Sequence, residues 1–84
     1  MFINKADNGS NNYCGTNVAR FRKQMGLSQR ELADLLQIEG LDIDKNAVQR
    51  IESGMRFVTD IELRALSCVL KKSYEELLEI PKEK

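Results

Sequence analysis

The stretch GLSQRELADLL, residues 26–36, decides the fold. Ser28 is followed three positions later by Glu31, the spacing of a capping box, in which each side chain bonds the other residue's backbone amide at the start of a helix. The apolar residues that follow recur at helical spacing, and we expect them to face a core: Leu32, Ala33, Leu35 and Leu36. The stretch therefore predicts a helix over about residues 29–37.

Similar signals predict four more helices. Capping boxes at Thr59–Glu62 and Ser73–Glu76 predict a helix over about 60–70 and a short one after Ser73 that Pro81 ends. Asp44 can cap a helix over about 45–53. An apolar stripe with a stop at Gly26 predicts a first helix over about 17–25; the stripe consists of Val18, Phe21 and Met25. No stretch alternates as a strand would, so we expect an all-α fold of five short helices.

The 84 residues suffice for one small domain. We expect this domain to span residues 16–80, with a tail over 81–84. Residues 1–15 are rich in Asn, Gly and Ser and have no periodicity, which predicts a flexible arm. Two interpretations of the arm stay open. It is either a disordered leader or an arm that reaches along a ligand, with Lys5 as its cation.

The composition, 42% hydrophobic and 31% charged residues, is that of an ordinary globular protein. The sequence contains neither a signal-peptide core nor an apolar run that could span a membrane, so we expect a cytoplasmic protein. The two cysteines lack metal-ligand spacing and the chain has no His, so we expect no metal and no cofactor. Cys68 lies in an apolar helical pattern and is expected in the core, whereas Cys14 lies in a polar segment and is expected to be an exposed, reduced thiol.

The stretch NAVQRIESG, residues 46–54, carries an unusual polar face. Val48 and Ile51 form its apolar stripe, and the other side carries amides and an arginine in place of the usual Glu and Lys. Asn and Gln match the hydrogen-bonding edge of adenine, and Arg or Lys matches that of guanine. A plain solvated face is the alternative. The stretch 46–54, however, follows a capped helix, as does the second helix of a helix-turn-helix. That second helix lies in the DNA major groove.

Three stretches together resemble the phage-repressor/Cro-like (Xre-type) helix-turn-helix family: VARFRKQMGLSQRELADLL, NAVQRIESGMR and TDIELRALSCVLKKSYEELL. The resemblance covers about residues 16–80. It implies a lambda-repressor-like helix-turn-helix domain and a double-stranded DNA operator as the partner. The 13 basic and 13 acidic residues cancel, so DNA binding would rest on local placement of charge.

The resemblance also implies roles for single residues. Base contacts are implied for Lys45, Asn46 and Arg50, with Gln49 beside them on the same face. Phosphate contacts are implied for Gln29, Ser53 and Arg56, and Gln29 would also brace the recognition helix. A phosphate contact at Gln29 makes physical sense, because free amides at a helix N-terminus attract phosphate. Arg22 and Glu52 match a pair that forms a partly buried, structural salt bridge.

The sequence departs from the family in the segment QIEGLDI, residues 37–43, which lengthens the turn between the second and third helices by about five residues. Either Gly40 ends an extended second helix while Leu41 and Ile43 pack inward, or the loop stands out and touches DNA or protein. The nearby acidic residues argue that the loop points away from phosphates: Glu39, Asp42 and Asp44.

These features predict a sequence-specific transcriptional regulator, expected to be a repressor, that binds a palindromic operator as a dimer. The last helix can form the dimer interface through Leu77, Leu78 and Ile80, or these residues can belong to the core. The alternative is a protein-interaction module, such as the antitoxin of a toxin–antitoxin pair or an anti-repressor adaptor, which the neutral net charge keeps open. We expect no enzyme, because the sequence has no His and no nucleophile–base pair or phosphate-loop motif.

Overall fold

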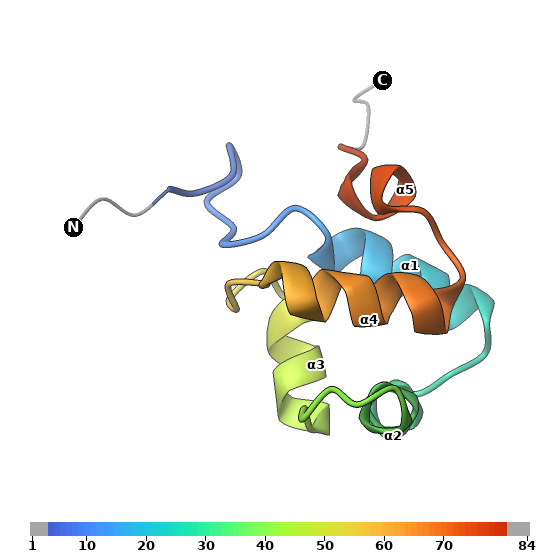
Figure 1. Ribbon diagram of the computed structural model, residues 1–84. Helices are drawn as coiled ribbons and strands as arrows, with labels where there is room; N and C mark the ends of the chain where they lie inside the picture. Colours follow the sequence, from blue (N-terminus) through green and yellow to red (C-terminus); the bar gives the residue numbers. More distant parts are fainter. Residues whose placement is uncertain (1–3, 81–84) are drawn as a thin grey trace.

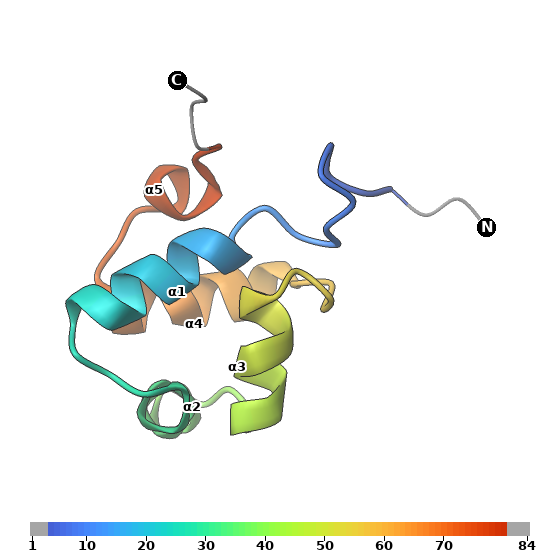
Figure 2. The same cartoon turned by 180° about the vertical axis from the view of Figure 1, so that it is seen from behind.

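The computed structural model describes residues 4–80. Within them the chain forms five helices and no strand: α1 (Gly15–Gln24), α2 (Gln29–Ile38), α3 (Lys45–Glu52), α4 (Asp60–Leu70) and α5 (Tyr74–Leu78). The prediction of an all-α fold is thus confirmed. In Figure 1, α4 crosses the middle of the molecule, with α2 and α3 on one side of it and α5 on the other. Figure 2 shows α1 running along α4. The expected helix end at Pro81 and the tail 81–84 lie outside the described residues.

Four of the helices begin where the sequence predicts, whereas α1 begins at Gly15, two residues before its predicted start. All three capping boxes form; in the first, Ser28 Oγ accepts from the Glu31 amide at 3.0 Å and Glu31 Oε1 accepts from the Ser28 amide at 2.9 Å. Asp44 caps α3 by accepting from the Ala47 amide. The Ser28 amide, which favours the charged carboxylate, also lowers the pKa of Glu31. Local chemistry alone therefore sets these starts.

One cluster of buried apolar side chains joins the helices. The fully buried members come from every helix and are Val18, Leu32, Leu36, Val48, Ile51, Leu66 and Leu77. Two residues predicted to face this core are instead exposed, Met25 by 43% and Leu35 by 37%. Met25 follows the end of α1, and Leu35 lies at the edge of the buried stripe of α2. No helix in residues 4–80 is long and apolar enough to cross a membrane.

Both expectations for the cysteines are wrong. Cys14 is buried and Cys68 is exposed. The buried stripe of α4 consists of Glu62, Ala65, Leu66 and Leu70, which turns Cys68 outward. Cys14 directly precedes α1 and points into the core, where burial raises the pKa of its thiol to about 11. The Cys14 thiol therefore stays protonated at neutral pH, and neither cysteine forms a disulfide.

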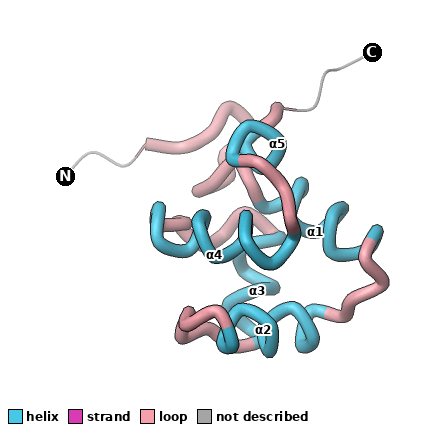
Figure 3. The backbone as a smooth tube through the Cα atoms, turned by 45° about the vertical axis from the view of Figure 1, so that its right-hand side comes forward, coloured by secondary structure: helices cyan, strands magenta, loops and turns pink. Residues whose placement is uncertain are grey.

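The lengthened connection between α2 and α3 packs inward. Gly40 adopts a φ of +97°, which favours glycine, and stops α2 just beyond Ile38. Ile43 is buried, Leu41 packs against the core, and Gln37 Nε2 donates to the Ile43 carbonyl at 2.8 Å. Figure 3 shows this connection lying against the end of α2. Of the two alternatives for this segment, the inward-packing one is confirmed.

The short helix α5 is attached to α1 by a buried amide. Asn17 is only 3% exposed, and its Nδ2 donates to the carbonyls of Leu77 and Glu79, each at 2.8 Å. Helices end with carbonyls that lack partners within the helix, so these bonds complete the end of α5. Leu77 is fully buried beside them. Asn17 therefore determines where α5 lies, a role that the sequence analysis did not predict.

Candidate nucleic-acid interface

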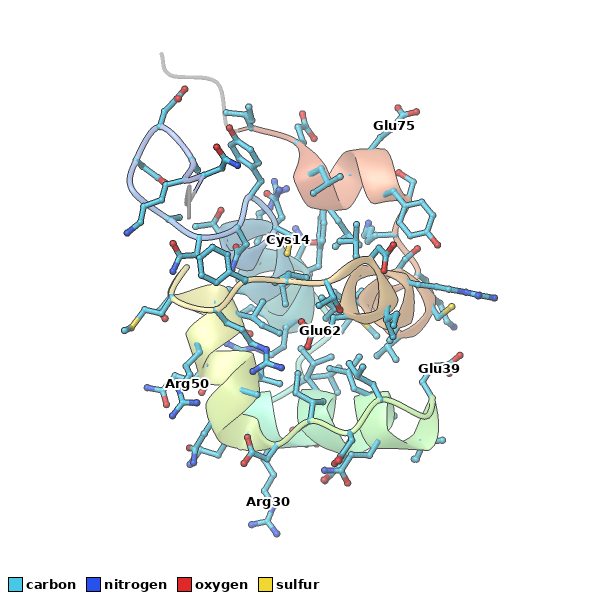
Figure 4. All side chains as sticks on the ribbon, turned by 60° about the vertical axis from the view of Figure 1, so that its left-hand side comes forward. Cys14, Arg30, Glu39, Arg50, Glu62 and Glu75 are labelled. Atoms are coloured by element: carbon cyan, nitrogen blue, oxygen red, sulfur yellow. The ribbon has the colours of Figure 1, made fainter. Side chains whose placement is uncertain are left out.

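The residues predicted to contact bases lie together on the open face of α3. Ala47, Val48 and Ile51 are buried and fix the orientation of the helix. The four candidate side chains are all exposed: Lys45, Asn46, Gln49 and Arg50. Figure 4 shows Arg50 projecting from α3 away from the rest of the domain. The helix thus presents two amides and two cations to solvent on one face.

The C-terminal end of α3 is held by a buried ion pair. Glu52 Oε2 lies 2.7 Å from Arg22 Nε, and Glu52 Oε1 accepts from Arg22 Nη2 at 3.0 Å. The two side chains are 10% and 7% exposed, so water screens the pair little. The hydrogen bonds that Arg22 donates to Glu52 raise the pKa of Arg22. The structural salt bridge predicted between the first and third helices is present.

Gln29, the first residue of α2, donates from Nε2 to Glu52 Oε1 at 3.0 Å. It therefore braces α3, as the sequence resemblance implies. The same bond places the N-terminus of α2 beside the C-terminus of α3, where its free amides can meet a phosphate close to the exposed face of α3. Arg30 follows Gln29, is exposed, and in Figure 4 points away from the domain below α2. Sequence reasoning missed this cation, since a single exposed arginine carries no periodic signal.

Arg56, predicted to contact phosphate, forms an ion pair with a carboxylate of the same chain. Its Nη2 lies 2.7 Å from Glu62 Oε2, and its side chain is 34% exposed. Glu62 is also the acidic member of the capping box of α4. In the free protein, Arg56 therefore ties the α3–α4 loop (residues 53–59) to α4. Ser53 is exposed, and its hydroxyl donates to the Arg50 carbonyl at 3.2 Å.

Of the acidic residues of the α2–α3 connection, Glu39 lies away from the exposed face of α3. Figure 4 places Glu39 at the far end of α2 from Arg50. The carboxylate of Asp44 accepts a hydrogen bond from the Ala47 amide at the start of α3. A phosphate backbone along α3 would therefore meet cations and amides before it met Glu39.

The last residues of the expected flexible arm contact the end of α3. Asn12 Nδ2 donates to the Ile51 carbonyl at 3.2 Å and to the Arg56 carbonyl at 2.7 Å. Asn11 donates from its backbone to the Gly54 carbonyl at 2.7 Å and from Nδ2 to the Met55 carbonyl at 2.8 Å. These contacts were not predicted, because an Asn-rich segment without periodicity has the same sequence pattern whether it is docked or free.

Two braced helices, with an open amide- and arginine-bearing face on the second, define a helix-turn-helix protein that binds DNA. The helix-turn-helix family HTH_3 matches residues 18–77, and the chain belongs to this Xre-type family of DNA-binding transcriptional regulators. A similar solved structure is that of the restriction-modification controller protein C.AhdI from Aeromonas hydrophila. The two share 30% sequence identity with a TM-score of 0.66, over 75% of this chain and 84% of that one. Among curated proteins, no sequence matches.

Proposed function

We propose that this regulator is a repressor that binds a palindromic operator as a homodimer, with α3 in the major groove. The observation that carries the proposal is the exposed set Lys45, Asn46, Gln49 and Arg50 on a helix that Arg22, Gln29 and Glu52 hold in place. These four side chains would read bases, and Gln29, Ser53 and Arg56 would contact the backbone. A dimer seated on a promoter represses by excluding other proteins, which requires neither catalysis nor a cofactor.

The dimer would form through α5. The three apolar residues predicted for the core or the dimer interface differ in burial. Leu77 is fully buried, whereas Leu78 and Ile80 are 43% and 61% exposed. The two exposed residues leave apolar surface that a second copy would cover. Two-fold docking then places the half-sites roughly 34 Å apart, one helical turn of DNA. Two chains bound per operator in a stoichiometric titration would support the dimer, and one chain would contradict it.

The test is a titration of the protein against the DNA upstream of its own gene, with random duplex as control, at two salt concentrations. Because C.AhdI controls a restriction–modification system, any such genes beside this one are the first candidates for regulation. Asn46→Ala and Arg50→Ala should each cost about 1–3 kcal/mol at the operator and little on random DNA. Arg64, exposed on α4, provides a matched control as Arg64→Ala. Unchanged operator affinity in both α3 variants would contradict the role of this helix.

A protein-binding role is the second candidate. The net charge is zero, and Ile38 and Ile61 are 82% and 71% exposed. Exposed apolar side chains of this size suit a protein partner better than a phosphate backbone. The same titration separates the candidates, since equal and weak binding to operator and random DNA would favour the protein partner.

A further inference from the structure

Residues 10–15 converge on the point where α3 ends and the α3–α4 loop begins. One side chain, Asn12, joins three segments there. Its Nδ2 donates to the last turn of α3, at Ile51, and to the loop, at Arg56, while its Oδ1 accepts from the amide of Gly15 at the start of α1 at 2.8 Å. The neighbouring Asn11 adds two bonds to the loop carbonyls. Four carbonyls at the end of α3 and in the loop thus take their partners from the arm.

The close approach of the arm depends on two glycines. A Cβ at Gly54, whose φ is +82°, would lie 2.6 Å from Ser10 Oγ, and a Cβ at Gly15 would collide with the Ile51 carbonyl. A hollow of about 470 Å³ lies between the arm and the domain, with Asp7, Tyr13 and Ser53 among its lining residues. The arm therefore holds the domain mainly through the two asparagines.

We propose that Asn12 is a positioning residue for DNA binding, which clamps the α3–α4 loop so that Ser53 and Arg56 are presented to the DNA backbone. The inference rests on the proposed function, which gives these two residues the backbone contacts. The loop amides of Met55 and Arg56 themselves bond only to the Arg50 carbonyl, at 2.9 and 3.2 Å. Without the clamp, the loop carbonyls would lose their partners and the loop would sample other conformations. The match to the family begins at residue 18, so the clamp lies outside it.

An isosteric change separates the clamp from the helix cap. Asn12→Asp keeps the oxygen that accepts from the Gly15 amide but replaces the Nδ2 donor with a carboxylate oxygen that faces two carbonyls. Asn8→Asp is the matched control, because Asn8 lies in the same arm and its side chain bonds only the nearby Ser10 amide. Both variants add one negative charge to the arm, so a difference between them reports the clamp.

The first readout needs no DNA. Amide hydrogen exchange at Met55 and Arg56 should be roughly tenfold faster in Asn12→Asp than in Asn8→Asp, because local opening becomes easier. Equal exchange rates would overturn the clamp itself. If Asn12→Asp does not fold, Asn11→Ala removes only the bond to the Met55 carbonyl, and it should change exchange in the same direction by a smaller factor.

The second readout is DNA affinity at a temperature where every variant is folded. Asn12→Asp should weaken binding to operator and random DNA alike, by roughly three- to tenfold beyond Asn8→Asp, as expected for lost backbone contacts. Faster exchange with unchanged DNA affinity would assign the clamp a purely structural role and overturn the inference. A wild-type protein that does not prefer its operator would count against the proposed function. The hydrogen-exchange comparison would still test whether Asn12 holds the loop.

Discussion

At the scale of single residues, Arg56 has two candidate partners, the carboxylate of Glu62 and a DNA phosphate. Its guanidinium pairs with the buried Glu62, and the hydrogen bond that it donates to that carboxylate raises the pKa of Arg56. A DNA phosphate is also an anionic acceptor for a guanidinium group, so it would compete with Glu62 for Arg56. We therefore expect Glu62 to weaken the attraction of Arg56 for any DNA, whatever its sequence.

Removing the charge of Glu62 should release Arg56. Glu62→Gln replaces the carboxylate with a neutral amide, whose oxygen can still accept from the backbone and complete the capping box of α4. The start of the helix is therefore retained. Affinity for random DNA should rise several-fold, and the salt dependence should steepen by about one released counterion. Fluorescence anisotropy titrations with random duplex at several salt concentrations measure both effects.

The matched control is Glu76→Gln, which removes the same charge from the same capping position in α5, where the carboxylate lies 3.8 Å from Lys72. A gain of equal size in this control would show that net charge alone is responsible. An unchanged salt slope in Glu62→Gln would show that Arg56 does not reach the DNA.

At the scale of elements, α5 is too short to be stable alone and depends on its neighbours. Its capping box sets where it begins, Leu77 anchors it in the core, and Asn17 of α1 satisfies two carbonyls at its end. The surface proposed for the dimer is therefore positioned from within the same chain, by a residue far away in sequence.

Asn17→Ala should detach the end of α5. The variant loses the two hydrogen bonds to α5, one of them buried, and a third from Arg20 Nη2 to Asn17 Oδ1 at 3.3 Å. This loss should lower the free energy of unfolding by about 1–3 kcal/mol. Urea denaturation followed by circular dichroism measures the change. Thr16→Ala alters an exposed residue in the same turn and should change stability little. Equal unfolding free energies for the two variants would contradict the role of Asn17.

At the scale of the whole molecule, one small core supports the entire domain. A chain of this size has a small free energy of unfolding, so a single cavity in the core should destabilise the whole domain. Leu66 is fully buried and contributes from α4 to the cluster shared by all five helices.

Leu66→Ala should cost about 2–5 kcal/mol, through lost burial and the cavity left behind. In a domain of this size that corresponds to a fall in Tm of about 10 °C or more. Ile38→Ala is the control, because Ile38 is 82% exposed and its truncation should leave Tm nearly unchanged. Thermal unfolding of both variants measures the contrast, and similar Tm values would show that Leu66 does not anchor the core.

The sequence by itself determined the features that depend on neighbours along the chain. Capping boxes, the stop at Gly26 and the apolar stripes act over one or two helical turns, so they predict the helices and the open face of α3. Only the tertiary structure decided which long-range partners meet. The pairing of Arg56 with Glu62 and the bonds of Asn12 to the end of α3 leave no periodic signal in the sequence. They arise because buried polar groups must find partners wherever the packed helices bring them.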